Sequence, residues 1–421
     1  MTEPAPAPRT RFSLIGPGIV VAATGVGAGD LVATLVAGSK YGYALLWAAV
    51  VGAVVKVALA EGVGRWTLAS GRTLFDGWSS LPGGGRRVNW ATAYFAVYVV
   101  VWGFVYGATA MTASALPMAA LWPVLDLKTW GVINGLVGLG LVWFGGYGLF
   151  EKVMAALVGV MFVTVVGLAV IVAPDVPRLL TGLWPTLPPG SSFYTLGLIG
   201  GVGGTITMAA YGYWLNIKGW RGPEWMATMR LDNRVAYVVT GVFVVAMLVV
   251  GAELLHAGGV ALQKGDRGLL DLDRVLRERF GPGVSMMFLV GFWATSFTSL
   301  IGVWQGVGLM FADFWAHMRG RAADEAVRGQ HSRAARGYML WLTFPPIALL
   351  FLERPFALIV AYGVLGSLFM PFLAGTLIWL LNSGRTPVEW RNGWVSNGLL
   401  AAAALLFAVL AGREIWALVA G

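Results

Sequence analysis

The sequence predicts an all-α integral membrane protein, on the evidence of its composition, the length of its apolar segments and the placement of its charges. The chain of 421 residues is 58% hydrophobic and only 12% charged, whereas a soluble domain carries about 25% charged residues. Its apolar residues fall into segments of about 20, enough for a helix to cross a hydrocarbon core of about 30 Å. Basic residues lie in the short connections between segments, as membrane topology requires, and form no nucleic-acid-binding stripe.

Eleven segments are expected to cross the bilayer. In chain order they cover residues 14–36, 43–63, 90–121, 130–147, 153–172, 194–217, 235–255, 284–314, 338–352, 356–381 and 395–410. We take residues 1–421 as one transmembrane domain that starts with a disordered cytoplasmic tail, 1–13. With the N-terminus inside, most Lys and Arg residues fall on the cytoplasmic side, as the positive-inside rule predicts. The expected location is therefore the cell membrane, in a multi-pass topology with the C-terminus outside.

Several other classes of protein are excluded by what the sequence contains. There is no cysteine, which excludes disulfides and thiolate metal sites. His256, His317 and His331 lie at or beyond predicted helix ends, too scattered for a zinc cluster. Neither a nucleophile and base pair nor a cleavable signal peptide is evident, so we expect no enzyme, no cofactor and no processing. The expected partners are the lipid bilayer and a small ion or solute, and nothing in the sequence indicates an oligomeric state.

Two of the predicted segments contain clusters of glycine that interrupt them. The clusters are Gly25, Gly27 and Gly29 before Asp30, and Gly197, Gly200, Gly201, Gly203 and Gly204 before Thr205, Thr207 and Met208. Glycine costs about 1 kcal/mol relative to alanine inside a helix, so such clusters mark either close helix packing or a break. They occupy the first and sixth segments, which is typical of inverted repeats with broken helices. We therefore predict repeats at 14–172 and 194–381, followed by an extra helix at 395–410.

A solute site is expected where the two breaks lie. A break exposes backbone carbonyls and helix ends near the middle of the bilayer, where they bind an ion or a polar solute. Asp30 is the only carboxylate that the segments place clearly deep in the bilayer, and such a group marks a functional site unless it merely caps a half-helix. The other predicted substrate-binding residues flank the breaks and are Gly27, Thr24, Met208, Thr205 and Thr207.

At this point a family resemblance becomes visible. Residues 16–47, GPGIVVAATGVGAGDLVATLVAGSKYGYALLW, followed by SGRTL at 70–74, resemble the opening two helices of the Nramp family. Residues 204–216, GTITMAAYGYWLN, resemble the sixth-helix signature of that family, with weaker similarity over 294–314. The resemblance implies a leucine-transporter-like fold of two inverted five-helix repeats plus extra helices, and transport of divalent metal ions.

The chain also departs from the pattern of that family. The first-helix metal motif, Asp-Pro-Gly-Asn, is here Gly27-Ala28-Gly29-Asp30, and the sixth-helix Met-Pro-His is Met208-Ala209-Ala210. The third helix, where the family places carboxylates linked to proton movement, contains no acid in this chain. The resemblance therefore implies metal ligation by Asp30 and Met208, with weak or absent proton coupling.

The chemistry of these residues leaves several alternatives open. A carboxylate, a thioether and backbone carbonyls together suit a partly hydrated magnesium or manganese ion, and the sulfur favours the transition metal. Met208 is otherwise a packing residue. Lys56, inside the second segment, is either an internal cation that replaces a coupling ion or a structural partner of Glu61 or of a helix carbonyl.

The predicted function is accordingly secondary-active transport of a manganese-like or magnesium-like divalent cation. The alternative is a transporter on the same scaffold that has lost the metal site and carries another small solute. The missing aspartate, histidine and third-helix acids favour that alternative.

Overall fold

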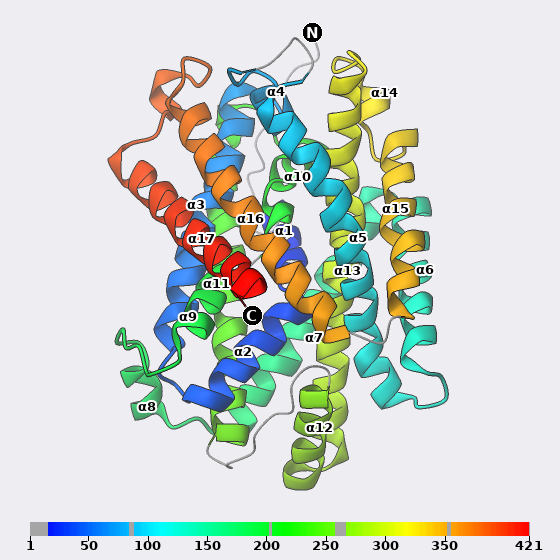
Figure 1. Cartoon of the computed structure of the whole chain (residues 1–421), viewed down its shortest axis with the longest axis vertical. Helices are drawn as coiled ribbons and strands as arrows, with labels where there is room; N and C mark the ends of the chain where they lie inside the picture. Colours follow the sequence, from blue (N-terminus) through cyan, green and yellow to red (C-terminus); the bar gives the residue numbers. More distant parts are fainter. Residues whose placement is uncertain (1–15, 84–87, 202–203, 257–266, 352–354, 421) are drawn as a thin grey trace.

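A computed structural model of the chain describes all residues except 1–15, 84–87, 202–203, 257–266, 352–354 and 421. The predicted tail, 1–13, lies outside the described residues, as do the side chains of some helical stretches, 28–33 among them. Within the described part every regular element is a helix. Figure 1 shows the long helices running roughly along the long axis of the molecule.

The helices begin and end as follows. The long and medium helices are α1 (Pro17–Gly25), α2 (Ala28–Tyr41), α3 (Leu46–Ser70), α5 (Trp90–Leu121), α6 (Leu127–Phe144), α7 (Tyr147–Ile171), α9 (Ser192–Gly201), α11 (Met226–Gly251), α12 (Arg267–Phe280), α13 (Pro282–Met318), α15 (Arg333–Leu350), α16 (Pro355–Asn382) and α17 (Trp394–Ala420). The short ones are α4 (Leu74–Trp78), α8 (Val176–Thr181), α10 (Tyr211–Ile217), α14 (Glu325–Arg328), η1 (Ile206–Met208), η2 (Pro223–Trp225), η3 (Ala252–His256) and η4 (Val388–Trp390).

Each predicted segment overlaps at least one of these helices. The first overlaps α1 and α2, and the sixth overlaps α9, η1 and α10. Among the described residues, 7 helical stretches are long and apolar enough to cross a membrane. They are α3, α5, α6, α7, Pro223–His256, α13 and Trp394–Arg413. The total of eleven spans therefore stays a prediction.

Several helix ends differ from the predicted ones. α11 begins at Met226 rather than at residue 235, and α7 begins at Tyr147 rather than at 153. Both predicted starts directly follow a charged residue, Lys152 or Arg234, whereas the helices extend back through charged residues. Glu151 of α7, for example, forms an ion pair with Lys218 at 2.6 Å. A paired charge no longer obliges the helix to end at the membrane surface.

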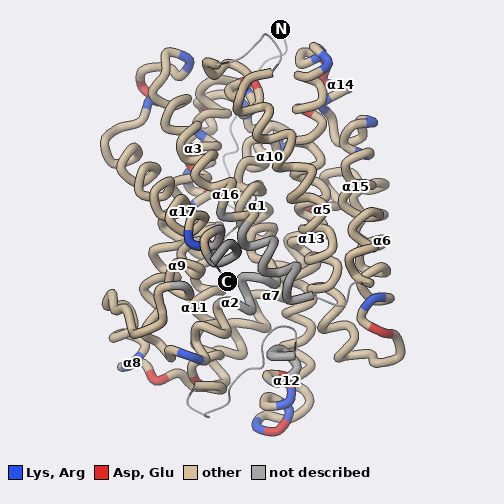
Figure 2. Tube along the Cα trace, viewed as in Figure 1, with Lys and Arg blue, Asp and Glu red and all other residues tan. Residues whose placement is uncertain are grey.

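Charged residues gather towards the two ends of the molecule, as Figure 2 shows. The short helices α4 and α14 lie at one end of the molecule, at the top of Figure 1, while α8 and α12 lie at the opposite end. Of the two interrupted helices, α1 and α10 lie towards the end of α4 and α14, and α2 and α9 lie towards the other. The chain therefore passes through the two pairs in opposite directions.

The two interruptions touch each other. α1 ends at Gly25, and Val26 has an extended backbone before α2 begins. In the sixth helix, Gly204 takes a left-handed φ of +91° before η1. A Cβ placed on Gly204 would lie 2.8 Å from the Cα of Gly25. Glycine at 204 is thus needed both for the backbone conformation and for the close approach of the two segments.

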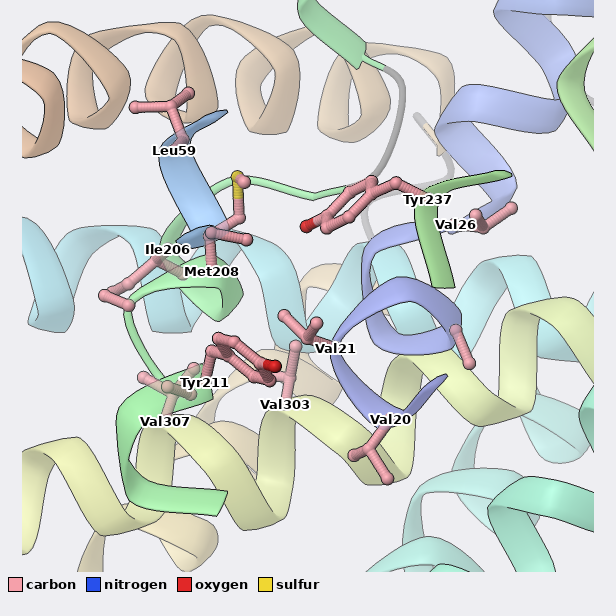
Figure 3. Close-up of a cluster of buried hydrophobic side chains, with 14 of the residues drawn as sticks. Val20, Val21, Val26, Leu59, Ile206, Met208, Tyr211, Tyr237, Val303 and Val307 are labelled. Atoms are coloured by element: carbon pink, nitrogen blue, oxygen red, sulfur yellow. The ribbon is translucent and has the colours of Figure 1, made fainter. Parts of the chain in front are cut away.

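Apolar side chains from several helices surround the interruptions, as Figure 3 shows. The labelled members are Val20, Val21, Val26, Leu59, Ile206, Met208, Tyr211, Tyr237, Val303 and Val307. They come from α1, α3, η1, α10, α11 and α13, together with Val26 between α1 and α2. This packing holds the unwound backbone in a single position within the bundle.

A buried carboxylate fastens the start of α1. Asp232 of α11 is 1% exposed, and its Oδ2 accepts hydrogen bonds from the Gly18 amide at 2.6 Å and from the Tyr211 hydroxyl at 3.0 Å. A Cβ on Gly18 would lie 2.6 Å from the same oxygen. Asp232 therefore joins α1 and α10, one half of each interrupted helix, to α11.

Replacing Asp232 is expected to destabilise the bundle. Asp232→Ala would leave the Gly18 amide and the Tyr211 hydroxyl without their buried acceptor, at a cost of about 1–3 kcal/mol. Thermal unfolding in detergent should show a lower midpoint for this variant and a smaller shift for Asp232→Asn, which keeps an acceptor oxygen. Glu389→Ala, at an exposed position, is the control. An unchanged midpoint for Asp232→Ala would contradict the fastening role.

Gly204→Ala should destabilise the protein through the backbone. The left-handed φ costs a non-glycine residue about 1–3 kcal/mol, and the new methyl group would meet Gly25. Gly375→Ala in α16 is the matched control, because no atom outside its own helix lies within 4 Å of the added carbon. The unfolding midpoint should fall for the first variant and stay near that of the unmodified protein for the second. Equal midpoints would mean that the two interruptions do not depend on this contact.

Candidate functional site

A hydroxyl of α13 holds the end of α1 at its interruption. The Ser299 hydroxyl donates a hydrogen bond to the Thr24 carbonyl at 2.9 Å. Its oxygen lies 2.8 Å from the Tyr106 hydroxyl of α5, which is therefore the donor in that second bond. A Cβ on Gly27 would lie 3.2 Å from the Ser299 oxygen. The opened backbone of the first helix is thus tied to α13 and, through it, to α5.

The predicted threonines have different surroundings. The Thr24 hydroxyl donates to the Val20 carbonyl of its own helix at 2.7 Å and packs against Gly302. The hydroxyls of Thr205 and Thr207 are buried and have no hydrogen-bond partner among the described residues. Both belong to the interruption of the sixth helix, whereas the Thr24 hydroxyl is bonded within its own helix.

Of the two predicted metal ligands, the structure describes the side chain of Met208 but not that of Asp30. Asp30 belongs to the first turn of α2, and its side chain lies outside the described residues. Met208 ends η1 and is fully buried in the apolar cluster of Figure 3. This environment agrees with the packing role of Met208, and ligation by either residue stays a prediction.

Lys56 reaches the interruption of the sixth helix. Its side chain is fully buried, and its ammonium donates a hydrogen bond to the Gly204 carbonyl. The same nitrogen lies 5.1 Å from the centre of the Phe407 ring. Glu61, one of the partners considered for Lys56, instead pairs with Arg65 at 3.1 Å and with Arg230 at 3.0 Å. Of the partners considered for Lys56, the structure thus shows a backbone carbonyl, that of Gly204, which lies in unwound backbone rather than in a helix.

A cavity of about 490 Å³ lies at the end of the molecule that carries α4 and α14. Its lining combines α3, α4, α10, α13 and the segment around α14. The polar and charged lining residues are Thr67, Thr73, Asp76, Tyr213, Asn216, Arg221, Glu325, Arg328 and Gln330. α10 begins directly after the interruption of the sixth helix and lines this cavity. The cavity therefore lies on the α10 side of the interruption.

A charged cluster borders this cavity. Asp313, fully buried in α13, accepts a hydrogen bond from the Tyr213 hydroxyl at 2.7 Å and forms an ion pair with Arg328 at 2.7 Å. His317 bridges Asp313 and Asp76, with its Nε2 at 2.9 Å from the latter. Burial raises the pKa of the Asp76 carboxyl, but hydrogen bonds from His317 and the Thr73 amide and the charge of Arg328 hold that pKa well below its usual range.

Sequence reasoning missed Asp232 and Asp313 as buried groups. Asp232 falls before the predicted start of its helix, and Asp313 falls beside a predicted end, where charged residues are ordinary. Two local signals were available. Asp313 and His317 are four residues apart, a spacing that puts both on one face of a helix. The absence of any glycine or proline from 226 to 240 would also have extended α11 back over Asp232.

Two interrupted helices that touch inside an all-helical, largely apolar bundle define a membrane transport protein with a leucine-transporter-like fold. Solved structures have the same fold. The manganese transporter of Eremococcus coleocola superposes with a TM-score of 0.76 at 15% identity, covering 98% of this chain and 90% of that one. Mhp1, a nucleobase-cation-symport-1 family transporter, gives a TM-score of 0.59 at 15% identity, covering 98% and 96%.

The chain belongs to the Nramp family, described as natural resistance-associated macrophage protein-like, whose profile matches residues 18–417. Among its relatives is the divalent metal cation transporter MntH of Mycobacterium tuberculosis, 26% identical over 317 residues, 72% of this chain and 71% of the relative. MntH of Mycobacterium leprae is 26% identical over 320 residues, with the same two coverages. The resemblance noted in the first and sixth helices therefore extends over nearly the whole chain.

Ser299→Ala is expected to loosen the first interruption. The change removes the donor to the Thr24 carbonyl and the acceptor for Tyr106, and each lost hydrogen bond costs about 1 kcal/mol. Thermal unfolding should show the loss, and transport in proteoliposomes should slow because the end of α1 is no longer held. Ser296→Ala is the matched control, since that hydroxyl bonds to the Phe292 carbonyl of its own helix. Indistinguishable behaviour of the two variants would argue against the role of Ser299.

Proposed function

We propose that this chain is a secondary-active transporter of divalent metal cations. The observation that supports it most is the contact between the two helix interruptions, Gly25 against Gly204. Beside it lie the hydroxyls of Thr205 and Thr207, which have no hydrogen-bond partner within the described part of the chain. Such interruptions place carbonyls and helix ends inside the bilayer, where they bind ions. Membership of the Nramp family and the metal-transporting relatives support the choice of cargo.

We propose the predicted topology with it: eleven spans, inverted repeats at 14–172 and 194–381, an extra helix at 395–410, and a cytoplasmic N-terminus. The opposite directions of the two interrupted helices support the inverted relation (Figure 1). The charged cavity then lies on the cytoplasmic side of the site. Tyr213 of α10 lines this cavity, and its hydroxyl donates a hydrogen bond to Asp313. α10 is therefore positioned between the proposed site and the cavity.

In the proposed site, Asp30 and Met208 ligate the metal, with oxygens of Gly27, Thr24, Thr205 and Thr207 around it. One carboxylate and one thioether are few ligands, so the ion keeps part of its water, as magnesium does in proteins. The sulfur favours manganese over magnesium. Since the Thr24 hydroxyl is used within its own helix, Thr24 would contribute through its carbonyl.

Proton coupling is proposed to be weak or absent. α5 contains no carboxylate along its length, and its contact with the site is the neutral Tyr106 hydroxyl. A second candidate function, transport of another small solute through a site that no longer binds metal, is favoured by one observation. The Lys56 ammonium lies on the Gly204 carbonyl, and a fixed positive charge at the interruption opposes the entry of a cation.

Uptake into proteoliposomes tests the function directly. Purified protein is reconstituted with a metal-sensitive dye or a pH-sensitive dye inside, and manganese, cobalt or magnesium is added outside. We expect metal entry without internal acidification. Acidification that accompanies the metal would contradict weak coupling, and no flux of any of the three metals would favour the second candidate.

Substitutions of the two proposed metal ligands, Asp30 and Met208, should distinguish the contribution of the carboxylate charge from that of the soft sulfur ligand. Asp30→Ala should abolish the heat of manganese binding in a calorimetric titration, because the site loses its carboxylate. Met208→Ala should weaken manganese and cobalt binding more than magnesium binding, since magnesium gains little from sulfur. Met339→Ala, at another fully buried methionine, is the control for packing. Equal losses for all three metals in Met208→Ala would assign Met208 to packing alone.

A further inference from the structure

The ammonium of Lys56 is placed where a transported cation would be expected. The residue lies in α3, within a stretch long and apolar enough to cross the membrane, and its side chain is fully buried. A lysine in such a place is expensive and marks a functional site by default. Its contact with Gly204 joins two residues 148 positions apart in the chain.

The carbonyl that it binds is one of those opened by the interruption. Gly204 has a left-handed φ of +91° and precedes the non-helical backbone of Thr205. A carbonyl in unwound backbone has no regular helical donor, and inside a bilayer it needs a partner from the protein or from a bound ion. A cation is a natural partner for such a carbonyl in a broken-helix transporter. In this structure the partner is the tethered ammonium.

A second contact stabilises the ammonium where it lies. The Phe407 ring of α17 is 5.1 Å from the Lys56 nitrogen, and an aromatic face stabilises a nearby cation. α3 also packs against both η1 and α9, the elements on either side of the interruption. The ammonium is thus held between the carbonyl of the interruption and an aromatic ring of α17.

We propose that Lys56 is a resident cation that determines specificity. Its ammonium occupies a cation subsite on the Gly204 carbonyl, and the transported ion must compete with it for that carbonyl. The inference deepens the proposed function and rests on it for the identity of the cargo. A divalent ion competes for the carbonyl with twice the charge of the ammonium. A monovalent ion offers no more charge than the tethered group and is excluded. Lys56 thus lowers the affinity for metal and excludes sodium and potassium.

Neutral and charged replacements of Lys56 test this assignment. Lys56→Gln keeps a donor for the carbonyl and removes the charge, Lys56→Met removes both, and Lys56→Arg keeps the charge. Manganese binding is measured by calorimetry in detergent, in choline chloride or in sodium chloride of equal ionic strength. Lys40→Gln is the matched control, because it removes one positive charge from an exposed position near the end of α2. Thermal unfolding identifies the variants that fold.

The expected result has two parts. Lys56→Gln should bind manganese at least about tenfold more tightly than the unmodified protein, because a like charge has been removed from the site. Sodium should weaken manganese binding in Lys56→Gln and leave it unchanged in the unmodified protein and in Lys56→Arg. A merely structural role for Lys56 would not produce competition by sodium. If Lys56→Gln does not fold, the comparison rests on Lys56→Met.

Failure of the inference is distinct from failure of the proposed function. If the unmodified protein binds manganese and the neutral variants bind it equally well, without competition by sodium, the resident-cation role is overturned and metal transport stands. If the unmodified protein binds no metal but Lys56→Gln does, the resident cation is supported and metal is not the natural cargo. If no form binds metal, both are overturned.

Discussion

The structure depends on one constraint, the need to satisfy backbone groups that two helices expose inside a membrane. Lipid offers no hydrogen bonds, so each opened group needs a partner from the protein. Here the partners come from neighbouring helices: Lys56 for the Gly204 carbonyl, Ser299 for the Thr24 carbonyl, and Asp232 for the Gly18 amide. α3 and α13 therefore support the two interruptions, and α11 supports the start of α1.

Small residues allow the helices to pack closely enough to form these contacts. Association of helices in a membrane relies on close approach, which glycine allows. Besides the contact of Gly25 with Gly204, a Cβ on Gly38 would lie 2.4 Å from the Leu248 carbonyl, and one on Gly251 would lie 2.5 Å from the Leu35 carbonyl. α2 and α11 are thus nearly in backbone contact. The same glycines that weaken a helix on its own allow the bundle to enclose the unwound segments.

Charge is arranged in two separate places along the molecule. At the interruptions the described charge is a single ammonium, that of Lys56, and its partner is a carbonyl. At the end of the molecule that carries the cavity, an ion-paired cluster contains Asp313, Asp76, His317 and Arg328. This cluster binds α10 through the hydrogen bond from Tyr213 to Asp313. Between these two places, α5 carries no charged residue along its length.

Local signals in the sequence were sufficient for the class of protein and for the two interruptions. Hydropathy depends on composition within about 20 residues, and a glycine cluster weakens a helix wherever it lies, so both can be identified from neighbouring residues alone. The motif resemblance likewise depends on contiguous residues. Only the tertiary structure decided that Gly25 meets Gly204, that Lys56 binds Gly204 while Glu61 pairs with Arg65 and Arg230, and that Asp232 binds the Gly18 amide. Each of these contacts, except the Glu61 and Arg65 pair, joins residues far apart in the chain, and their pairing depends on how the helices pack.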